Sequence, residues 1–432
     1  MNVRREALNA FMDIAYRGAY ANLRMKTLSS VLPDSQAKWA SALVYTALDH
    51  RLTSEYYLSS YVRDHCKPVI RAILCLGATE LLFFSTSDHA AVSEYVNLTK
   101  SVGKAPLAAF VNAVLRALAR DNEAGSLPPL PTEPKQRLSV QFSYPLWLVS
   151  EWVDTYGEAF TQQLLSSPQA KPTIRAQFPY TTEELCRSLS VPSERGIYDP
   201  NALVLENGTD FTALPEFTDG RMTIQSESAM LVCRALGDVS GKAVLDACAA
   251  PGGKSAYLAS LTENTVRLTC MELHEHRVEL IRRTFERLHV AAEIVHADAA
   301  VLNGAYCGRF DAVLVDAPCS GLGLTHDKPD IRYAKSDADI VSLCEIQKSI
   351  LSACAEYVKP NGVLVYATCT ISKRENEDCV RSFLASHSDF ALEALPIPIC
   401  NDGTVQLFPH IHGLDGFFIA RMRRSERSAG CI

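Results

Sequence analysis

The second half of the chain alternates short apolar runs with helical segments, and this alternation is the feature that most restricts the possible folds. Five runs have the length and composition of buried strands: residues 243–247 (AVLDA), 266–272 (VRLTCME), 292–298 (AEIVHAD), 310–318 (FDAVLVDAP) and 362–368 (GVLVYAT). Strands that alternate with helices in this way usually pair in parallel, with helices covering both faces of the sheet. We therefore expect an α/β fold with a doubly wound, largely parallel sheet.

Residues 4–120 show a different, helical pattern. Apolar residues recur there at helical spacing, for example at Ala7, Phe11 and Ile14. Residues 121–135 (DNEAGSLPPLPTEPK) then contain four prolines, which cannot continue a helix and suit an extended spacer. The 432 residues have room for two or three domains. We predict a helical domain at 1–127, a proline-rich linker at 128–139, a small α+β module at 140–235 and the sheet domain at 236–425.

The sequence does not suit a secreted, membrane-spanning or zinc-binding protein. Charged residues interrupt the first fifteen residues, which therefore lack the continuous apolar core and the small-residue cleavage site of a secretory signal. The most apolar stretch, residues 69–84, is interrupted by Arg71 and Glu80 and is too short for a membrane span, so it predicts a buried helix. The 14 cysteines include no C-x-x-C pair of the kind that opens most zinc sites. We expect a cytoplasmic protein with reduced thiols and no bound metal.

The charge is unevenly distributed along the chain. The formal net charge is −7, but residues 1–127 hold 14 Lys and Arg against 11 Asp and Glu, which leaves 28 against 38 for the remainder. Affinity for phosphate groups should therefore reside in the N-terminal domain, although a mildly basic solvated surface would give the same count.

Acidic residues end or follow the first three predicted strands, at the edge where ligands of parallel sheets bind. The first strand leads through Asp246 into a loop with two glycines, where the backbone can approach a ligand closely. The second strand ends in Glu272, which is placed to accept hydrogen bonds from both hydroxyls of a ribose, and the third leads to Asp298. Together these strand ends predict a nucleoside-binding site.

Two other interpretations of the glycine loop are weaker. Gly253, Lys254 and Ser255 could end a phosphate-binding P-loop, but that motif requires a glycine at the position of Cys248. An ordinary tight turn between a strand and a helix would explain the glycine pair, but not the acidic residues at the following strand ends.

The fourth and fifth strands lead to two cysteines, Cys319 and Cys369. A disulfide between them is conceivable, but a redox enzyme more often places both thiols in one C-x-x-C. Two thiols beside a nucleoside-like cofactor suggest covalent activation of a pyrimidine. A thiolate that adds to C6 of cytosine makes C5 nucleophilic enough to take a methyl group from S-adenosylmethionine.

Several motifs together resemble those of a known enzyme family. DACAAPGGK (246–254), DAPCSGLG (316–323), TCT with the following SKRENE (368–377) and HGLDGFFIARMRR (412–424) are similar to motifs of the NOL/NOP/Sun family of RNA 5-methylcytosine methyltransferases. The helical region, with RREAL near its start and AFVNAVLRAL near its end, resembles the NusB-like RNA-binding domain of the RsmB (Sun/Fmu) branch. The resemblance covers nearly the whole chain.

The resemblance implies a Rossmann-like methyltransferase domain that uses S-adenosylmethionine, preceded by an all-helical NusB-like domain. A last strand at 416–422 would insert antiparallel into the sheet. Cys369 would be the nucleophile and Cys319 the thiol that assists product release, while Asp316 would lie between cofactor and target base. Glu272 would hold the ribose and Asp298 would lie near the adenine. The loop around the cofactor would consist of Cys248, Ala249, Ala250, Pro251, Gly252, Gly253 and Lys254.

The implied function is methylation of cytosine C5 in RNA, with 16S ribosomal RNA of the small subunit as substrate and a monomeric protein. Transfer RNA is an alternative substrate, and a noncatalytic RNA-binding ribosome assembly factor is an alternative of a different class, against which both thiols argue. The chain departs from the family pattern at Thr370, where serine is common, at Leu322, where threonine is usual, and at Ser226, where the branch often has aspartate.

Overall fold

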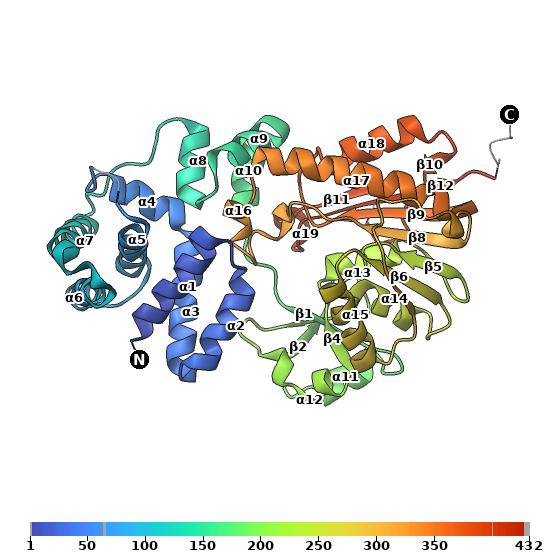
Figure 1. Cartoon of the computed structure of the whole chain (residues 1–432), viewed down its shortest axis with the longest axis horizontal. Helices are drawn as coiled ribbons and strands as arrows, with labels where there is room; N and C mark the ends of the chain where they lie inside the picture. The colour runs from blue at the N-terminus through green and yellow to red at the C-terminus, as the bar shows by residue number, and fades with distance from the viewer. Residues whose placement is uncertain (1, 64–65, 400, 427–432) are drawn as a thin grey trace. The chain divides into compact units, whose positions relative to one another are not determined.

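The computed structural model describes residues 2–63, 66–399 and 401–426, so residues 1, 64–65 and 400 of the predicted domains lie outside it. The chain divides into two compact units. The helical unit comprises Met1–Ser167 together with Thr325–Ser336. The sheet unit comprises Pro168–Leu324 together with Asp337–Ile432. Figure 1 shows the whole chain.

The helical unit is built from α-helices, as the periodicity of residues 4–120 predicts. Asn2 caps the first helix by accepting hydrogen bonds from the backbone N–H groups of Arg4 and Arg5. The elements are α1 (Val3–Arg17), α2 (Ala21–Val31), α3 (Asp34–Asp49), α4 (Arg51–Ser59), α5 (Pro68–Phe83), α6 (Asp88–Thr99), η1 (Lys100–Lys104), η2 (Ala105–Leu107), α7 (Ala108–Glu123), α8 (Pro134–Phe142), α9 (Leu146–Tyr156), α10 (Glu158–Leu165) and α16 (Ile331–Ala334).

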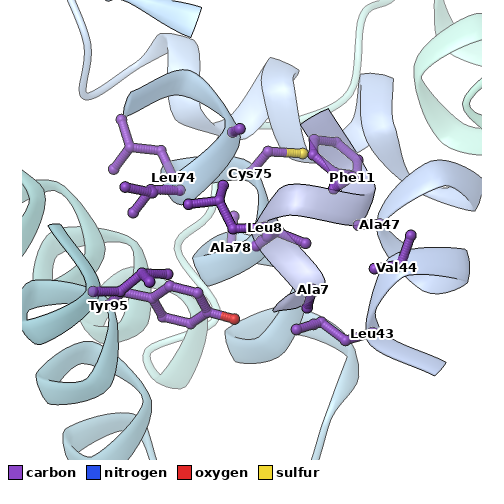
Figure 2. Close-up of a cluster of buried hydrophobic side chains, with 14 of the residues drawn as sticks. Ala7, Leu8, Phe11, Leu43, Val44, Ala47, Leu74, Cys75, Ala78 and Tyr95 are labelled. Carbon is purple, nitrogen blue, oxygen red and sulfur yellow. The ribbon is translucent and has the colours of Figure 1, made fainter. Parts of the chain in front are cut away.

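The core of this unit is built from apolar side chains of α1, α3, α5 and α6. Figure 2 shows Leu8 and Phe11 of α1 packed among residues of α3 and α5, with the Tyr95 ring of α6 at one side. A buried ion pair lies beside these residues. Arg4 donates to Glu80 through Nη2 and Nε at 2.6 and 3.1 Å, and the Tyr95 hydroxyl donates to the same carboxylate at 2.8 Å.

The run Asp88–Glu123 is long and apolar enough, by composition, to cross a membrane. Its backbone, however, leaves the helical conformation at Val102 and Gly103, where φ of Gly103 is 72°. The two parts, α6 and α7, each contribute buried side chains to the core of the helical unit. They are therefore core helices, as is α5, which confirms the buried helix expected at residues 69–84.

The structure divides the middle of the chain differently from the predicted boundaries. Helix α8 begins at Pro134, inside the range predicted as a linker, because proline is tolerated in the first helical turn and Glu133 caps that turn. Helices α8–α10 belong to the helical unit and not to the small α+β module. Thr53 of α4, for example, donates to the carbonyl oxygen of Val140 at 2.5 Å.

Residues 325–336 also pack into the helical unit, although they follow the fourth predicted strand. Arg332 pairs with Asp49 at 3.0 Å, and its guanidinium lies 4.2 Å from the ring centroid of Tyr144. The Tyr333 hydroxyl donates to the carbonyl oxygen of Ser143 at 2.8 Å. These contacts between residues far apart in sequence explain why the local pattern gave no sign of this assignment.

The sheet unit begins with a small antiparallel sheet of order β2-β3-β1-β4. Its strands are β1 (Thr173–Ala176), β2 (Ser193–Arg195), β3 (Ala202–Leu205) and β4 (Met222–Ile224), accompanied by α11 (Thr182–Ser188), η3 (Phe211–Ala213) and α12 (Pro215–Thr218). Residues Ile174, Leu203 and Met222 are completely buried in its core.

The larger sheet has the order β10-β12-β9-β8-β5-β6-β7, with β11 paired to β12. Strands β5–β9 pair in parallel, and β12 pairs antiparallel with β9. This confirms the largely parallel sheet and the antiparallel last strand. The strands are β5 (Ala243–Asp246), β6 (Arg267–Glu272), β7 (Glu293–His296), β8 (Phe310–Asp316), β9 (Val358–Thr368), β10 (Phe390–Leu392), β11 (Thr404–Leu407) and β12 (Phe417–Arg424).

Helices cover both faces of the larger sheet, because alternate side chains of its buried strands point to opposite sides. Val244 and Leu314 pack with α13, α14 and α15, whereas Leu245 and Val313 pack with α17 and α18. Figure 1 shows these two groups of helices on opposite sides of the strands. The helices and turns are α13 (Glu227–Arg234), α14 (Gly253–Leu261), α15 (Glu275–Leu288), η4 (Gly304–Tyr306), η5 (Leu322–Leu324), α17 (Asp337–Tyr357), α18 (Glu377–Ser386) and α19 (Pro409–His412).

Candidate active site

The residues predicted to bind cofactor and substrate follow the carboxyl ends of β5–β9. The strand order places the loop after β5 between those after β6 and β8, with the loop after β9 beyond β8. Glu272 and Asp298, the carboxylates predicted to bind the nucleoside, therefore lie toward one end of this row of loops. The two cysteines lie toward the other end.

The loop after β5 turns sharply into α14. Gly252, which precedes the helix, has a φ of 100°, a conformation that side chains disfavour. A Cβ atom at Gly252 would also lie 3.0 Å from the ring of Phe285, whereas one at Gly253 would have no neighbour within 4 Å. The backbone conformation and the nearby Phe285 ring explain why a glycine occupies position 252. At Gly253 the open space leaves the backbone accessible at the start of α14.

A buried carboxylate, Asp246, precedes this loop, and a half-buried thiol, Cys248, lies within it. The Ser255 hydroxyl donates to the Asp246 carboxylate at 2.6 Å. Burial raises the pKa of Asp246 to about 6. Burial also raises the pKa of the Cys248 thiol well above its ordinary value. Cys248 is therefore a neutral thiol, suited to apolar contact and not to nucleophilic attack.

The carboxylates after β6 and β7 lie on neighbouring strands, since Glu272 is in register with His296. Glu272 is buried and accepts a hydrogen bond from the backbone N–H of His274 at 3.0 Å. Arg277 lies 3.5 Å from the same carboxylate. Asp298 accepts from the backbone N–H of Ala300 at 2.8 Å.

Lys254 and Asp316 join the loop after β5 to the end of β8. The Lys254 ammonium lies 2.6 Å from the Asp316 carboxylate. Burial alone would lower the pKa of Lys254, but its interaction with Asp316 outweighs burial and raises it. Lys254 therefore carries a permanent positive charge at this edge of the sheet, and its electrostatic interactions extend to the Cys369 sulfur.

The two predicted cysteines lie side by side. The sulfur atoms of Cys319 and Cys369 are 3.3 Å apart, although 50 residues separate them in sequence. The hydrogen bond to Cys369 and burial raise the pKa of Cys319 well above its ordinary value, and nearby carboxylates add to the shift. Cys319 is thus a protonated thiol that can donate its S–H to the Cys369 sulfur.

A buried carboxylate holds the two cysteine loops together. Glu375 accepts from the backbone N–H of Ser320 at 2.9 Å and from its hydroxyl at 2.6 Å. Gln347 of α17 donates to Glu375 at 3.0 Å. Ser320 also bonds the hydroxyl of Thr370 at 2.7 Å. Ser320 follows Cys319 and Thr370 follows Cys369, so this network restrains the distance between the sulfur atoms.

A second set of hydrogen bonds supports the loop after β9. Asn376 donates to the carbonyl oxygen of Thr370 at 3.0 Å and to the Gln406 side chain at 2.7 Å. It also accepts from Thr368 at 2.6 Å. Glu375 and Asn376 lie within the SKRENE motif, but the sequence reasoning assigned no individual role to either. The sequence did contain one indication of their role, namely two consecutive polar residues shortly after the predicted nucleophile.

The three departures from the family pattern have simple structural descriptions. Thr370 keeps the hydroxyl that a serine would supply, and this hydroxyl bonds Ser320. Leu322 is buried with 1% of its side chain exposed, so its effect is on packing and not on an exposed surface. Ser226 caps α13 by accepting from the backbone N–H of Ala229 at 3.4 Å.

Residues 2–63, 66–399 and 401–426 contain neither a metal-binding cluster nor a disulfide. No group of three or more His, Cys, Asp or Glu side chains there is arranged to hold a metal ion, and the described cysteines are unbridged. Buried cysteines such as Cys75, Cys270 and Cys354 have pKa values raised by burial, so they pack as small neutral groups.

Comparison with known proteins places this site in context. Residues 234–423 match the family described as "16S rRNA methyltransferase RsmB/F", and residues 1–120 match the NusB family. A similar curated protein is "Probable ribosomal RNA small subunit methyltransferase B" of Bacillus subtilis (strain 168). It is 36% identical over 450 residues, which cover 98% of this chain and 99% of that protein.

Two solved structures share the fold. The crystal structure of PH0851 has a TM-score of 0.82 at 22% identity and covers 97% of this chain and 99% of its own. NSun6 from Pyrococcus horikoshii with SFG has a TM-score of 0.57 at 19% identity and covers 69% of this chain and 99% of its own. On the strength of the full-length relative and the two family matches, the chain belongs to the RsmB/F family of 16S rRNA methyltransferases and carries a NusB-family domain at its N-terminal end.

Proposed function

We propose that this protein methylates C5 of a cytosine in 16S ribosomal RNA, with S-adenosylmethionine as methyl donor and a covalent bond between Cys369 and C6 as intermediate. The observation that carries the proposal is the pair of sulfur atoms 3.3 Å apart after neighbouring parallel strands. The family match and the name of the Bacillus subtilis relative support the ribosomal substrate.

The chemistry of the loop after β5 and its neighbours fits S-adenosylmethionine. The open backbone at Gly253 admits a ligand, and the carboxylates of Glu272 and Asp298 supply acceptors for a ribose diol and an adenine amino group. SFG, which is bound in the NSun6 structure, is an analogue of this cofactor. When bound, S-adenosylmethionine supplies the methyl group that C5 receives.

Attack by Cys369 is the step that makes C5 reactive. Cytosine C5 is too weak a nucleophile to accept a methyl group directly. When the Cys369 thiolate forms a bond to C6, the electron pair of the C5–C6 double bond becomes available at C5. The Cys319 S–H and the positive charge of Lys254 both favour negative charge on the Cys369 sulfur before attack.

Cys319 then assists release. After methylation, C5 loses its proton to a base, the C5–C6 double bond re-forms, and the bond between C6 and Cys369 breaks to return the thiolate. The Cys319 sulfur, 3.3 Å from Cys369, is close to the bond that must break. Because its raised pKa keeps Cys319 protonated, its S–H can donate a hydrogen bond to the Cys369 sulfur as the bond to C6 breaks, which stabilises the departing thiolate.

The helical unit supplies cationic side chains for the RNA backbone. Six of the 14 Lys and Arg residues in 1–127 form an ion pair with a described residue, among them the Arg4 that binds Glu80. Lys100, Lys104 and Arg116, around and after the break between α6 and α7, form no ion pair with a described residue. We assign phosphate contacts to these three residues.

The experiment that tests the proposal separates the two thiols. Cys319→Ala should leave attack on C6 possible but slow the release of product, so a protein–RNA adduct should accumulate that survives denaturing electrophoresis. The trapped base should be a cytosine that has left its stack to reach Cys369. The control is Cys319→Ala/Cys369→Ala, which should form no adduct.

An adduct in the double variant, or in Cys369→Ala alone, would overturn the assignment of the thiols. Bisulfite sequencing of RNA from cells that lack the protein should show one lost methylcytosine in 16S ribosomal RNA. A methylcytosine lost from transfer RNA instead would show that transfer RNA is the substrate. If no methylcytosine were lost from any RNA, the protein would be a noncatalytic assembly factor.

A further inference from the structure

The chain around β1 lies along α14, the helix that follows the predicted cofactor loop. Arg175 donates to the carbonyl oxygen of Gly253 at 3.3 Å, and Gln177 donates to that of Ala256 at 3.5 Å. The backbone N–H of Phe178 donates to the Ser260 hydroxyl at 2.9 Å. These contacts occur at successive turns of α14, and the contact of Arg175 is at its first residue.

Arg175 is an unusual residue for this position. Its side chain is completely buried, and it forms no ion pair with a carboxylate of the described residues. Its guanidinium donates to the side-chain oxygens of Gln225 and Gln177, each at 2.6 Å, and lies 4.7 Å from the ring centroid of Tyr257. A buried cation costs free energy unless it is fully hydrogen-bonded, and burial lowers the pKa of Arg175 to about 10.

The small sheet holds α14 at a second point. The Tyr257 hydroxyl donates to both oxygens of the buried Asp199, at 2.7 and 2.8 Å. Arg234 of α13 binds the same carboxylate at 2.6 and 2.8 Å. Because Tyr257 also contacts the Arg175 guanidinium, the ring restrains Arg175 against the first turn of the helix. The orientation of the Gly253 carbonyl therefore depends on the small sheet.

We propose that Arg175 is a positioning residue for the cofactor loop, acting through the carbonyl of Gly253, and that the small sheet thereby contributes to cofactor affinity. This inference rests on the proposed function, because it assumes that residues 248–254 bind S-adenosylmethionine. By bonding the Gly253 carbonyl, Arg175 sets the peptide plane where the loop meets α14 and prepares the loop before the cofactor arrives.

The test measures S-adenosylmethionine binding by calorimetry with the full-length protein. Arg175→Met should weaken the affinity about tenfold, which corresponds to the loss of one hydrogen bond from a charged donor. KM for S-adenosylmethionine should rise by a similar factor, with kcat changed less than about twofold, because the residue touches neither cofactor nor base. Arg175→Lys, which keeps the charge and one donor, should recover part of the affinity.

Two control variants separate positioning from general stability. Arg421→Met removes another buried arginine of the sheet unit, which bonds Glu393 at 2.7 Å, and should lower thermal stability without changing cofactor affinity. Arg195→Met removes an exposed arginine of the small sheet that pairs with Glu183 at 2.6 Å, and should change neither quantity.

The outcomes distinguish the inference from the proposed function. If the wild-type protein binds no S-adenosylmethionine, the proposed function fails. If the wild type binds it and a folded Arg175→Met protein binds equally well, Arg175 is structural only and the inference is overturned. If Arg175→Met does not fold, Arg175→Lys decides: an affinity below that of the wild type supports positioning, and an unchanged affinity overturns it.

Discussion

Two buried glutamates, one in each unit, show how the same side chain serves different purposes. Glu80 of the helical unit and Glu375 of the sheet unit are both completely buried. Glu80 faces a cation, Arg4, and a tyrosine hydroxyl from another helix. Glu375 pairs with no cation in the described part of the chain and instead accepts from neutral donors of Ser320 and Gln347.

The difference shows that the two units balance the charge of a buried carboxylate in different ways. In the helical unit the charge of Glu80 is neutralised within the core, so its contribution is to join α1, α5 and α6. In the sheet unit the neutral donors around Glu375 come from both cysteine loops and α17, so its contribution is to hold two reactive sulfur atoms in place. Removing the first should reduce stability, and removing the second should reduce activity.

The largest effect on activity is expected at Cys369, whose sulfur the Glu375 network holds in place. Cys369→Ala should lower methyl transfer by several orders of magnitude, because no other group can form the bond to C6. Its thermal unfolding and S-adenosylmethionine affinity should remain close to those of the wild type, because only a half-buried sulfur is removed. Methyl-transfer assays on ribosomal RNA with single-turnover kinetics measure the effect. Near-normal turnover would exclude Cys369 as nucleophile.

The direct test of the comparison exchanges each glutamate for glutamine. Glu80→Gln leaves Arg4 without its buried partner and should lower the free energy of unfolding by about 3 kcal/mol, with little change in kcat of the folded protein. Glu375→Gln places an amide donor against the donors of Ser320 and Gln347, and should lower kcat about 10- to 100-fold through loop displacement. Urea unfolding and methyl-transfer kinetics check both. Equal effects of the two variants on kcat would contradict the distinction.

Glu272 is a third buried glutamate, and we expect its carboxylate to bind the cofactor directly. Glu272→Ala should weaken S-adenosylmethionine binding by about 1.5–3 kcal/mol, the scale of hydrogen bonds to a charged group. Calorimetry measures this change directly. Glu293→Ala on the adjacent strand is the control, since Glu293 bonds Thr269 at 3.1 Å and is not predicted to touch the cofactor. Unchanged affinity in Glu272→Ala would show that this strand end was misassigned.

The smallest expected effect concerns exposed charge on the helical unit, where cations are not neutralised as Arg4 is. Lys100→Ala/Lys104→Ala/Arg116→Ala should weaken RNA binding and reduce the slope of log K against log salt by up to about 2, because fewer counterions are released. Arg17→Ala/Arg120→Ala, which removes two exposed but ion-paired cations, should change the slope less. Equal slopes for the wild type and the triple variant would place the RNA surface elsewhere.

Local sequence patterns determined the secondary structure of the catalytic half. The five apolar runs became β5–β9, because burial on both faces demands continuous apolar residues in the central strands, and the last strand that the family resemblance implied became β12. The cysteine motifs likewise marked Cys319 and Cys369, which do lie together. Strand ends in a parallel sheet share one edge, so this proximity follows once the topology is known.

Only the tertiary structure decided which segments pack together and which polar groups meet. We predicted a linker at 128–139 and a separate α+β module at 140–235, yet helices α8–α10 join the helical unit, as do residues 325–336 through Arg332 and Tyr333. The Glu375 network and the contact between Arg175 and Gly253 join residues that no local spacing relates. Periodicity reports how one segment divides its surface between core and solvent, whereas these contacts depend on the free energy of burying groups that come from distant parts of the chain.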